Sequence, residues 1–126
     1  MSRTIIISRS APAAPASYSQ AVKAAGLVFV SGTAPIDPAT GRLVDGTVQA
    51  QVAQCLTNIA AILEAAGTSL ANAVSATLIV ADEDDFAPAS EEWERWFPTD
   101  PPARQGAKMP VRVAGMKVSI AMIALA

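Results

Sequence analysis

The segment from Thr47 to Ala66 constrains this chain most, because its apolar residues recur at spacings of three and four. Such spacing places these residues along one face of an α-helix. The apolar positions are Val48, Val52, Cys55, Ile59, Ile62 and Ala66. Thr47 is a suitable N-cap, and Gly67 suits the position that follows the last turn. A long helix with a single apolar face needs another element to cover that face.

Short segments rich in β-branched and apolar residues precede and follow this helix. Pro12 and Pro15 exclude a helix from the connector at 10–17, and Gly26 suits a hairpin-like turn. Residues 35–41 have turn chemistry throughout. Strands are expected at 4–8, 18–23, 27–31, 73–81, 103–109 and 117–125, with a short edge strand at 43–44.

A second helix is expected to start at the acidic cluster 82–85 and to run to about Trp96. Acidic residues at the start of a helix complement its dipole, and Pro88 fits the first turn. The aromatic residues Trp93, Trp96 and Phe97 are expected in a core or an interface, since no basic groove accompanies them. The element order predicts an α+β domain with both helices on one face of a mixed sheet. At 126 residues, one domain spanning 1–126 is expected.

Charge and residue counts exclude several kinds of site. Nine Lys plus Arg face eleven Asp plus Glu, for a net charge of −2, and no basic run is present. Nucleic acid is therefore disfavoured as a partner. Cys55 is the single cysteine and histidine is absent, which excludes an intramolecular disulfide, a Cys-His or Ser-His pair and metal catalysis. Cys55 is expected to be a packed core thiol.

The chain is rich in apolar residues, at 52%, and poor in charged ones, at 16%. One face of the predicted sheet would stay apolar and uncovered in a monomer, which predicts self-association. No signal-peptide core and no run approaching a membrane span occurs, so a cytoplasmic location without membrane attachment is expected.

Seven short motifs are distributed over nearly the whole chain. They are Ala-Pro-Ala-Ala at 11–14, Tyr-Ser-Gln at 18–20, Leu-Val-Phe-Val-Ser-Gly at 27–32, Asp-Pro-Ala-Thr-Gly at 37–41, Asn-Ile at 58–59, Leu-Glu-Ala-Ala-Gly at 63–67 and Pro-Ala-Arg at 102–104. In this order they resemble the Rid (reactive intermediate deaminase, YjgF-like) family. The resemblance implies a chorismate-mutase-like fold and a homotrimer whose sheets line a central barrel, with ligand clefts between subunits. It also implies hydrolytic deamination of reactive enamines and imines to a 2-oxo acid and ammonia, without a cofactor.

The resemblance places a ligand site around Arg104, which matches the family's carboxylate-binding arginine. A guanidinium holds a carboxylate bidentately with little reorganisation. Gly32 and Gly106 match positions whose backbone N–H groups face the ligand, and many relatives have cysteine at the second of these. Glycine permits a ligand to approach the backbone closely, although a turn or bulge would also explain either residue.

Hydroxyl groups complete the predicted site. Tyr18 matches the family tyrosine whose hydroxyl points into the cleft, while Ser31 and Ser90 match polar positions near it. Structural hydrogen bonding is the alternative role of these two serines. Ser119 departs from the family, because archetypal deaminases carry there a glutamate that positions or activates the hydrolytic water. A general acid or base typically contributes about 10²–10⁴-fold, so its loss predicts a weaker deaminase or another substrate.

Three functions remain open from the sequence. The first is imine or enamine deamination, in which Arg104 clamps the carboxylate and Tyr18 with Ser119 orders substrate and water. Imines hydrolyse in water, so positioning alone can catalyse the reaction. The second is a non-catalytic trimer that binds a small carboxylate metabolite, since the arginine is present and the acid is absent. The third is a pathway-specific enzyme for another amine-derived intermediate, because Gln105 and the short loop at 97–104 also alter the pocket.

Overall fold

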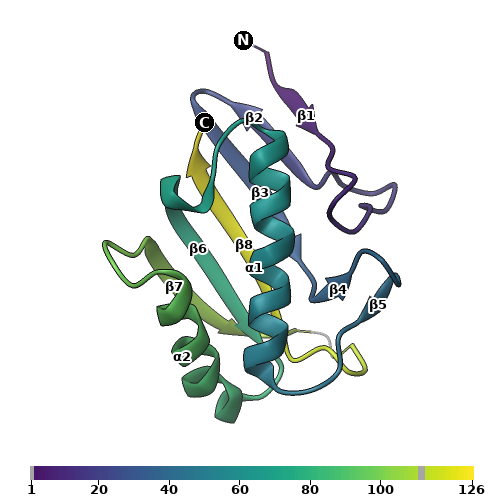
Figure 1. Ribbon diagram of the computed structural model, residues 1–126, viewed down its shortest axis with the longest axis vertical. Coiled ribbons are helices and arrows are strands. Elements are labelled where there is room, and N and C mark those ends of the chain that lie inside the picture. The colour runs from purple at the N-terminus through teal and green to yellow at the C-terminus, as the bar shows by residue number, and fades with distance from the viewer. Residues whose placement is uncertain (1, 111–112) are drawn as a thin grey trace.

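A six-stranded sheet carries two helices on one of its faces (Figure 1). The computed structural model describes residues 2–110 and 113–126. The strands of this sheet are β1 (Thr4–Ile6), β2 (Ala21–Ala24), β3 (Leu27–Thr33), β6 (Ala73–Val80), β7 (Ala103–Lys108) and β8 (Val118–Leu125). The helices are α1 (Val48–Ala65) and α2 (Phe86–Trp96), and the separate strands β4 (Ile36–Asp37) and β5 (Arg42–Leu43) pair with each other.

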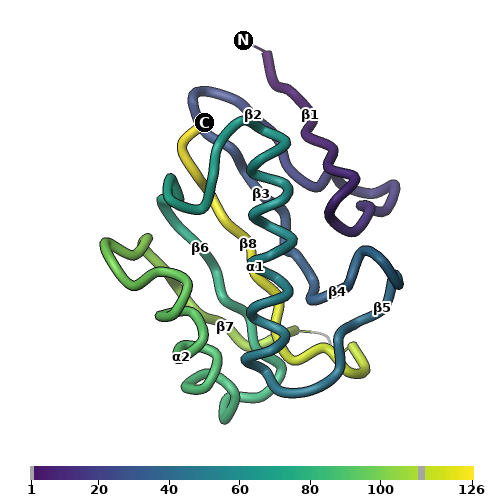
Figure 2. Tube along the Cα trace, viewed as in Figure 1, coloured from purple at the N-terminus to yellow at the C-terminus, as the bar shows by residue number. Residues whose placement is uncertain are grey.

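The strand order in the sheet is β1-β2-β3-β8-β6-β7. Neighbouring strands are antiparallel except β6 and β7, which run parallel because α2 connects them as a crossover. The trace in Figure 2 shows the N-terminal strand at one edge of the molecule and β7 with α2 at the other. The α+β architecture with a mixed sheet and both helices on one face, predicted from the sequence, is confirmed.

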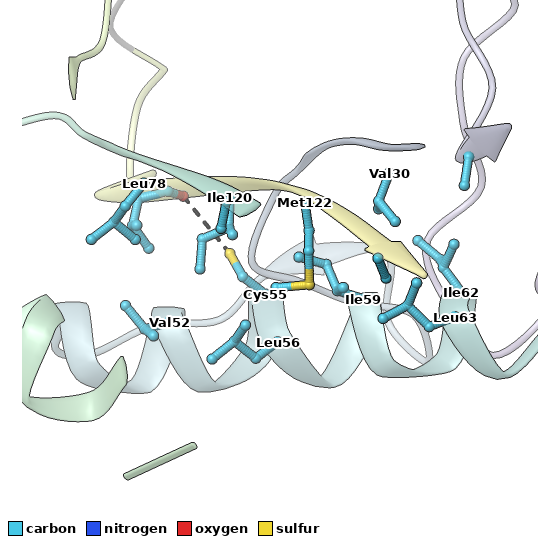
Figure 3. Packing of buried hydrophobic residues seen from close by; sticks show 14 of the residues in the cluster. Val30, Val52, Cys55, Leu56, Ile59, Ile62, Leu63, Leu78, Ile120 and Met122 are labelled. Carbon is cyan, nitrogen blue, oxygen red and sulfur yellow. Dashed lines mark hydrogen bonds between the residues drawn. The ribbon is translucent and has the colours of Figure 1, made fainter. Parts of the chain in front are cut away.

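Helix α1 has the ends and the buried face that its sequence predicts. The Thr47 side chain accepts a hydrogen bond from the Ala50 N–H, and Gly67 follows the last turn at a φ of +86°. All six apolar positions of the predicted face are buried. In Figure 3, Cys55, Ile59 and their neighbours on α1 point toward side chains of β3, β6 and β8, which form the other side of the core.

The strands predicted at 4–8 and 18–23 are shorter in the structure, and the strand predicted at 43–44 is shifted by one residue. Residues 18–20 do not belong to β2, because the Gln20 side chain instead donates to the Ser8 and Pro12 carbonyls and ties down the preceding connector. The strand expected at 43–44 is Arg42–Leu43. Its partner, Ile36–Asp37, lies in the segment expected to be turn throughout, and Gly41 completes the turn between them at a φ of +73°.

The second half of the chain follows the predicted order. Strand β6 lies between β8 and β7, as expected of a central strand. The acidic cluster forms a short 3₁₀ turn, Glu83–Asp85, in which the Asp82 carboxylate accepts from the Asp84 N–H. Helix α2 begins just after it, with Pro88 in the first turn, where its missing N–H costs no hydrogen bond.

Among residues 2–110 and 113–126, no helix covers the sheet face opposite α1 and α2. Along β8, Val118, Ile120 and Met122 are buried beneath the helices, so the alternate residues, beginning with Ser119, face the other way. On β3, the ring of Phe29 belongs to this open face and is 42% exposed. No helix among the described residues is long and apolar enough to cross a membrane.

Asn58 connects α1 to the segment that follows β3. It is fully buried, and its amide donates to the Ala34 and Ile36 carbonyls at 3.2 and 2.8 Å. Asn58→Ala should lower the free energy of unfolding by about 2–4 kcal/mol, because both carbonyls lose their buried donor. Urea unfolding at one fixed protein concentration measures the effect. Thr57→Ala, at an exposed position of the same helix, serves as the control and should change stability by less than about 0.5 kcal/mol.

Candidate functional site

Arg104 lies on the edge strand β7 with its side chain turned toward α2. Its Nη2 donates to the Ser90 hydroxyl at 2.9 Å. Its Cζ atom lies 5.3 Å from the centroid of the Phe86 ring and 5.5 Å from that of Trp93. Both rings are within the range of a cation–π contact. A hydrogen bond and two aromatic rings therefore hold the guanidinium in one place.

Helix α2 supplies all three of these contacts because of its periodicity. Phe86, Ser90 and Trp93 follow one another at spacings of four and three, which places them on one face of the helix. Trp93 is 4% exposed and forms part of the core, and it also packs against Phe97 with ring centroids 4.5 Å apart. The side of α2 that covers β7 is thus both core and support for the guanidinium.

Most of the hydrogen-bonding capacity of Arg104 is unused by the described chain. A guanidinium has five N–H donors, and one is bound to Ser90. Among residues 2–110 and 113–126, no carboxylate lies within ion-pair distance of this side chain. Arg104 is only partly buried, so a ligand can reach the remaining donors. A guanidinium with free donors can bind a carboxylate or a phosphate group bidentately.

Gly106 lies two residues beyond Arg104 on β7 and faces α2 as well. The Phe86 ring occupies the place where a side chain would be, because a Cβ atom added to Gly106 would lie 2.3 Å from the ring's Cε2. Since β7 is the last strand of the sheet, one row of its backbone N–H and C=O groups points away from β6. The strand thus presents backbone groups near Arg104.

The other predicted site residues gather around the end of β3. A bulge between Val30 and Thr33 takes Gly32 out of the regular pairing with β8. A Cβ atom added to Gly32 would lie 3.5 Å from the Ser119 hydroxyl, so these two residues are neighbours. Ser31 donates its hydroxyl to the Ser19 carbonyl at 2.6 Å. The side chain of Tyr18 lines a small hollow of about 70 Å³ together with Ser31 and Gly32.

A single chain does not bring the seven predicted residues together. The Arg104 group, with Ser90 and Gly106, lies on the helix side of β7. The Ser119 group contains Ser119 on β8, Ser31 and Gly32 on β3, and Tyr18 in the connector before β2. Strands β8 and β6 separate β3 from β7, which amounts to about 14 Å at the usual strand spacing. Arg104 pairs with Ala76 and Ser119 with Ile79, so their side chains project from opposite faces of the sheet.

Cys55 lies apart from both groups. It is fully buried, and its thiol donates to the Thr33 carbonyl at 3.3 Å. Burial raises the pKa of this thiol, which keeps it protonated and unreactive at neutral pH. The prediction of a packed core thiol is confirmed. The described residues also contain no cluster of three or more side chains suited to a metal ion.

Two residues that contact the guanidinium were not predicted as part of the site. Phe86 was not singled out, and Trp93 was assigned to a core or an interface, which is correct for its packing but omits Arg104. The signal available in the sequence was the spacing of Phe86, Ser90 and Trp93 on one face of the second helix. That signal has meaning only once β7 is known to lie beneath α2.

Comparison with known proteins identifies the family. Residues 8–126 match the family model described as endoribonuclease L-PSP. The chain belongs to this family. A bovine (Bos taurus) relative named 2-iminobutanoate/2-iminopropanoate deaminase is 40% identical, over 98% of this chain and 90% of the bovine protein. The resemblance to the Rid proteins noted in the sequence is confirmed.

Solved structures of family members have the same fold. A Rid family protein of unknown function from Yersinia pestis superposes with a TM-score of 0.93 at 32% identity, covering 99% of this chain and 100% of that one. Escherichia coli TdcF with bound serine gives a TM-score of 0.89 at 32% identity, covering 98% of both chains. The sheet and helices that support both groups of site residues therefore belong to the common architecture of the family.

Arg104→Ala should weaken the binding of 2-oxobutyrate by at least about 30-fold, because truncating one partner of a charged hydrogen-bonded pair costs 2 kcal/mol or more. Isothermal titration calorimetry measures the affinity. The unfolding midpoint should change little, since the guanidinium makes one hydrogen bond to its own chain. Arg95→Ala is the matched control, because Arg95 lies on α2 with 79% of its side chain exposed. The affinity of this variant for 2-oxobutyrate should equal that of the wild type. Equal affinity of the Arg104 variant would place the ligand elsewhere.

Proposed function

We propose that this protein hydrolyses reactive imines and enamines derived from amino acids. In the reaction, water adds to the imine carbon, the nitrogen takes up a proton, and the C–N bond breaks. The products are a 2-oxo acid and ammonia, so atoms and charge balance without a redox partner. No cofactor is required, because the imine carbon is already electrophilic and the leaving nitrogen needs only a proton.

The observation that carries this proposal is the guanidinium of Arg104, which is fixed in place and has no carboxylate partner among the described residues. A 2-imino acid has a carboxylate next to its reacting carbon, so clamping the carboxylate also fixes the position of that carbon. Arg104 offers several N–H donors in a planar fork, and Ser90 and two rings hold that fork in place. Positioning of this kind removes much of the entropic barrier to the attack of water.

Hydroxyl and backbone groups are proposed to hold the water and the imine nitrogen. Ser119 and Gly32 are neighbours on the open face, and Tyr18 lies near the same strand end with its side chain half exposed. A serine hydroxyl donates and accepts hydrogen bonds but does not take a proton from water at neutral pH. The proton must therefore pass between the water and the substrate nitrogen, and Ser119 orients the water for that transfer.

We further propose that the complete cleft forms between neighbouring subunits of a homotrimer. Within one chain, β8 with Ser119 lies two strand spacings, or about 10 Å, from β7, and β3 with Gly32 lies three spacings, or about 14 Å, from it. The side chains of Arg104 and Ser119 also face opposite ways. Pairing the Arg104 group of one subunit with the Ser119 group of the next would unite all seven residues. The apolar open face of the sheet supports this assembly, because Phe29 and Leu125 would lose their exposure in it.

The names of relatives support the reaction and the ligand class. The bovine relative is named for deamination of 2-iminobutanoate and 2-iminopropanoate, and E. coli TdcF was solved with serine, an α-amino acid with the same carboxylate. The family description names an endoribonuclease. The net charge of −2, without a histidine in the chain, does not favour RNA as the substrate here.

A non-catalytic binder of small carboxylates is the second candidate function, and Ser119 favours it. The archetypal deaminases that the chain resembles have a glutamate there, whereas Arg104 is retained. A site with the clamp and without the acid would still bind 2-oxo acids. Turnover of freshly generated iminopropionate separates the two candidates, because a binder leaves the spontaneous hydrolysis rate unchanged. A pathway-specific enzyme would bind 2-oxo acids weakly and act on another amine-derived intermediate.

A homotrimer is the expected state in solution. Light scattering at micromolar concentration should give three times the 12.9 kDa of one chain. A charge introduced on the open face by Phe29→Lys should shift the mass toward that of one chain, because a buried unpaired ammonium opposes assembly. Lys is also tolerated at exposed strand positions, so the variant chain should still fold. A wild-type mass near 12.9 kDa would contradict the proposed cleft between subunits.

Ser119→Glu should raise the turnover of iminopropionate, because a carboxylate beside Gly32 can accept a proton from the attacking water. The gain is at most about 10²–10⁴-fold for one well-placed base, and less is expected without supporting hydrogen bonds. Ser119→Gln is the control, because glutamine has about the size of glutamate but does not accept a proton. This variant should show no gain in turnover.

The affinity for 2-oxobutyrate must be measured in the same variants, since the new carboxylate could pair with a neighbouring subunit's Arg104 and block the clamp. If both the wild type and Ser119→Glu bind 2-oxobutyrate but neither hydrolyses iminopropionate, the deaminase function is wrong and the carboxylate binder is favoured.

A further inference from the structure

We infer that Phe86 positions Arg104, and that glycine is required at 106 because it lets the Phe86 ring lie against β7. The inference rests on the proposed function, since it concerns the clamp for the substrate carboxylate. It assigns a role in ligand affinity to Phe86, which does not itself need to touch the ligand.

The Phe86 ring contacts both Gly106 and the guanidinium. Residues 104 and 106 are two apart on β7, so both face α2, where Phe86 is the first residue. Two ring atoms, Cε2 and Cζ, would lie 2.3 and 2.8 Å from a Cβ atom added at 106. The centroid of the same ring is 5.3 Å from the Cζ atom of Arg104. The ring therefore transmits the size of residue 106 to the position of the guanidinium.

A methyl group at 106 would force the ring to move by about 1 Å or more, because non-bonded carbons separate to 3.5–4.0 Å. Space for that movement exists. A pocket of about 310 Å³ borders both Phe86 and Gly106, and its other walls are formed by Val80, Glu83, Ala107 and Lys108. The variant chain can thus fold with the ring displaced. The cation–π contact with Arg104 would then be lost or reoriented, leaving Ser90 and Trp93 as its supports.

Glycine at 106 makes β7 less stable than alanine would, which supports a functional reason for glycine at this position. In a strand, glycine is less favourable than alanine by roughly 0.5–1 kcal/mol, since it loses more backbone entropy on folding. Gly106 lies within β7, paired with Leu78 of β6. Its φ is not among the positive values found in this chain, so the backbone conformation does not demand glycine. The contact with Phe86 is what excludes a side chain here.

Gly106→Ala is the decisive variant. The dissociation constant for 2-oxobutyrate and the KM for iminopropionate should rise by at least about tenfold, since a misplacement of about 1 Å can cost as much as 10²-fold. The unfolding midpoint should stay equal or rise. In a Phe86→Leu background, the same change at 106 should alter affinity by less than threefold, because the smaller side chain leaves room for the methyl group. Phe97→Leu, the same change at a ring that contacts Trp93 but not Arg104, should keep the wild-type response to Gly106→Ala.

A ligand-free measurement keeps this test separate from the test of the deaminase. The Nε–H resonance of Arg104, identified by its loss in Arg104→Ala, should carry ring-current shifts from Phe86 and Trp93 in a ¹H–¹⁵N spectrum. It should move in Gly106→Ala and not move further when that change is added to Phe86→Leu. An unchanged resonance and affinity in Gly106→Ala, or equal effects of the methyl group in both backgrounds, would overturn the inference. Absence of turnover in the wild type would count against the proposed function alone.

Discussion

Side chains alternate between the two faces of the sheet, and the helices cover one face only (Figure 1). This constraint decides which residues can share a site. Arg104 and Gly106 of β7 lie beneath α2, whereas Ser119 of β8 points away from the helices. A register slip of one residue would exchange these faces, and the buried row of β8, from Val118 to Met122, makes such a slip very costly. The core therefore fixes the geometry of both groups.

The two groups differ in how much of their order comes from their own chain. Arg104 is held by α2 through Ser90, Phe86 and Trp93, so its guanidinium is positioned before any partner or ligand arrives. The Ser119 group lacks such a cover. Tyr18 is 53% exposed and belongs to a connector that Gln20 ties to the sheet. In the proposed trimer, the neighbouring subunit would supply the missing cover together with the carboxylate clamp.

Local signals predicted the frame of the fold and failed where long-range contacts decide the outcome. The α1 helix, its caps and its buried face followed from spacing, N-cap chemistry and one glycine. The predicted start of β2 at residue 18 was wrong. The Gln20 side chain donates hydrogen bonds to the Ser8 and Pro12 carbonyls, and no local sequence pattern indicates these contacts. The motifs indicated Arg104. The support from Phe86 could not be predicted, since it depends on a crossover that brings residue 86 over residue 106.

The charges in the proposed cleft would affect ligand affinity and imine turnover in different ways. A protonated imine is more reactive toward water than a neutral one, but a nearby guanidinium disfavours its positive charge. A glutamate on β8 would offset that effect, and Ser119 does not. None of the proposed site residues is acidic, so the substrate's own carboxylate would be the one negative charge beside Arg104 in the proposed cleft. The proposed site would favour anions over zwitterions, so it would hold a 2-oxo acid product more readily than a protonated imino acid. Hydrolysis in the proposed cleft would then proceed with little help from charge, by confinement of the neutral imine and its water.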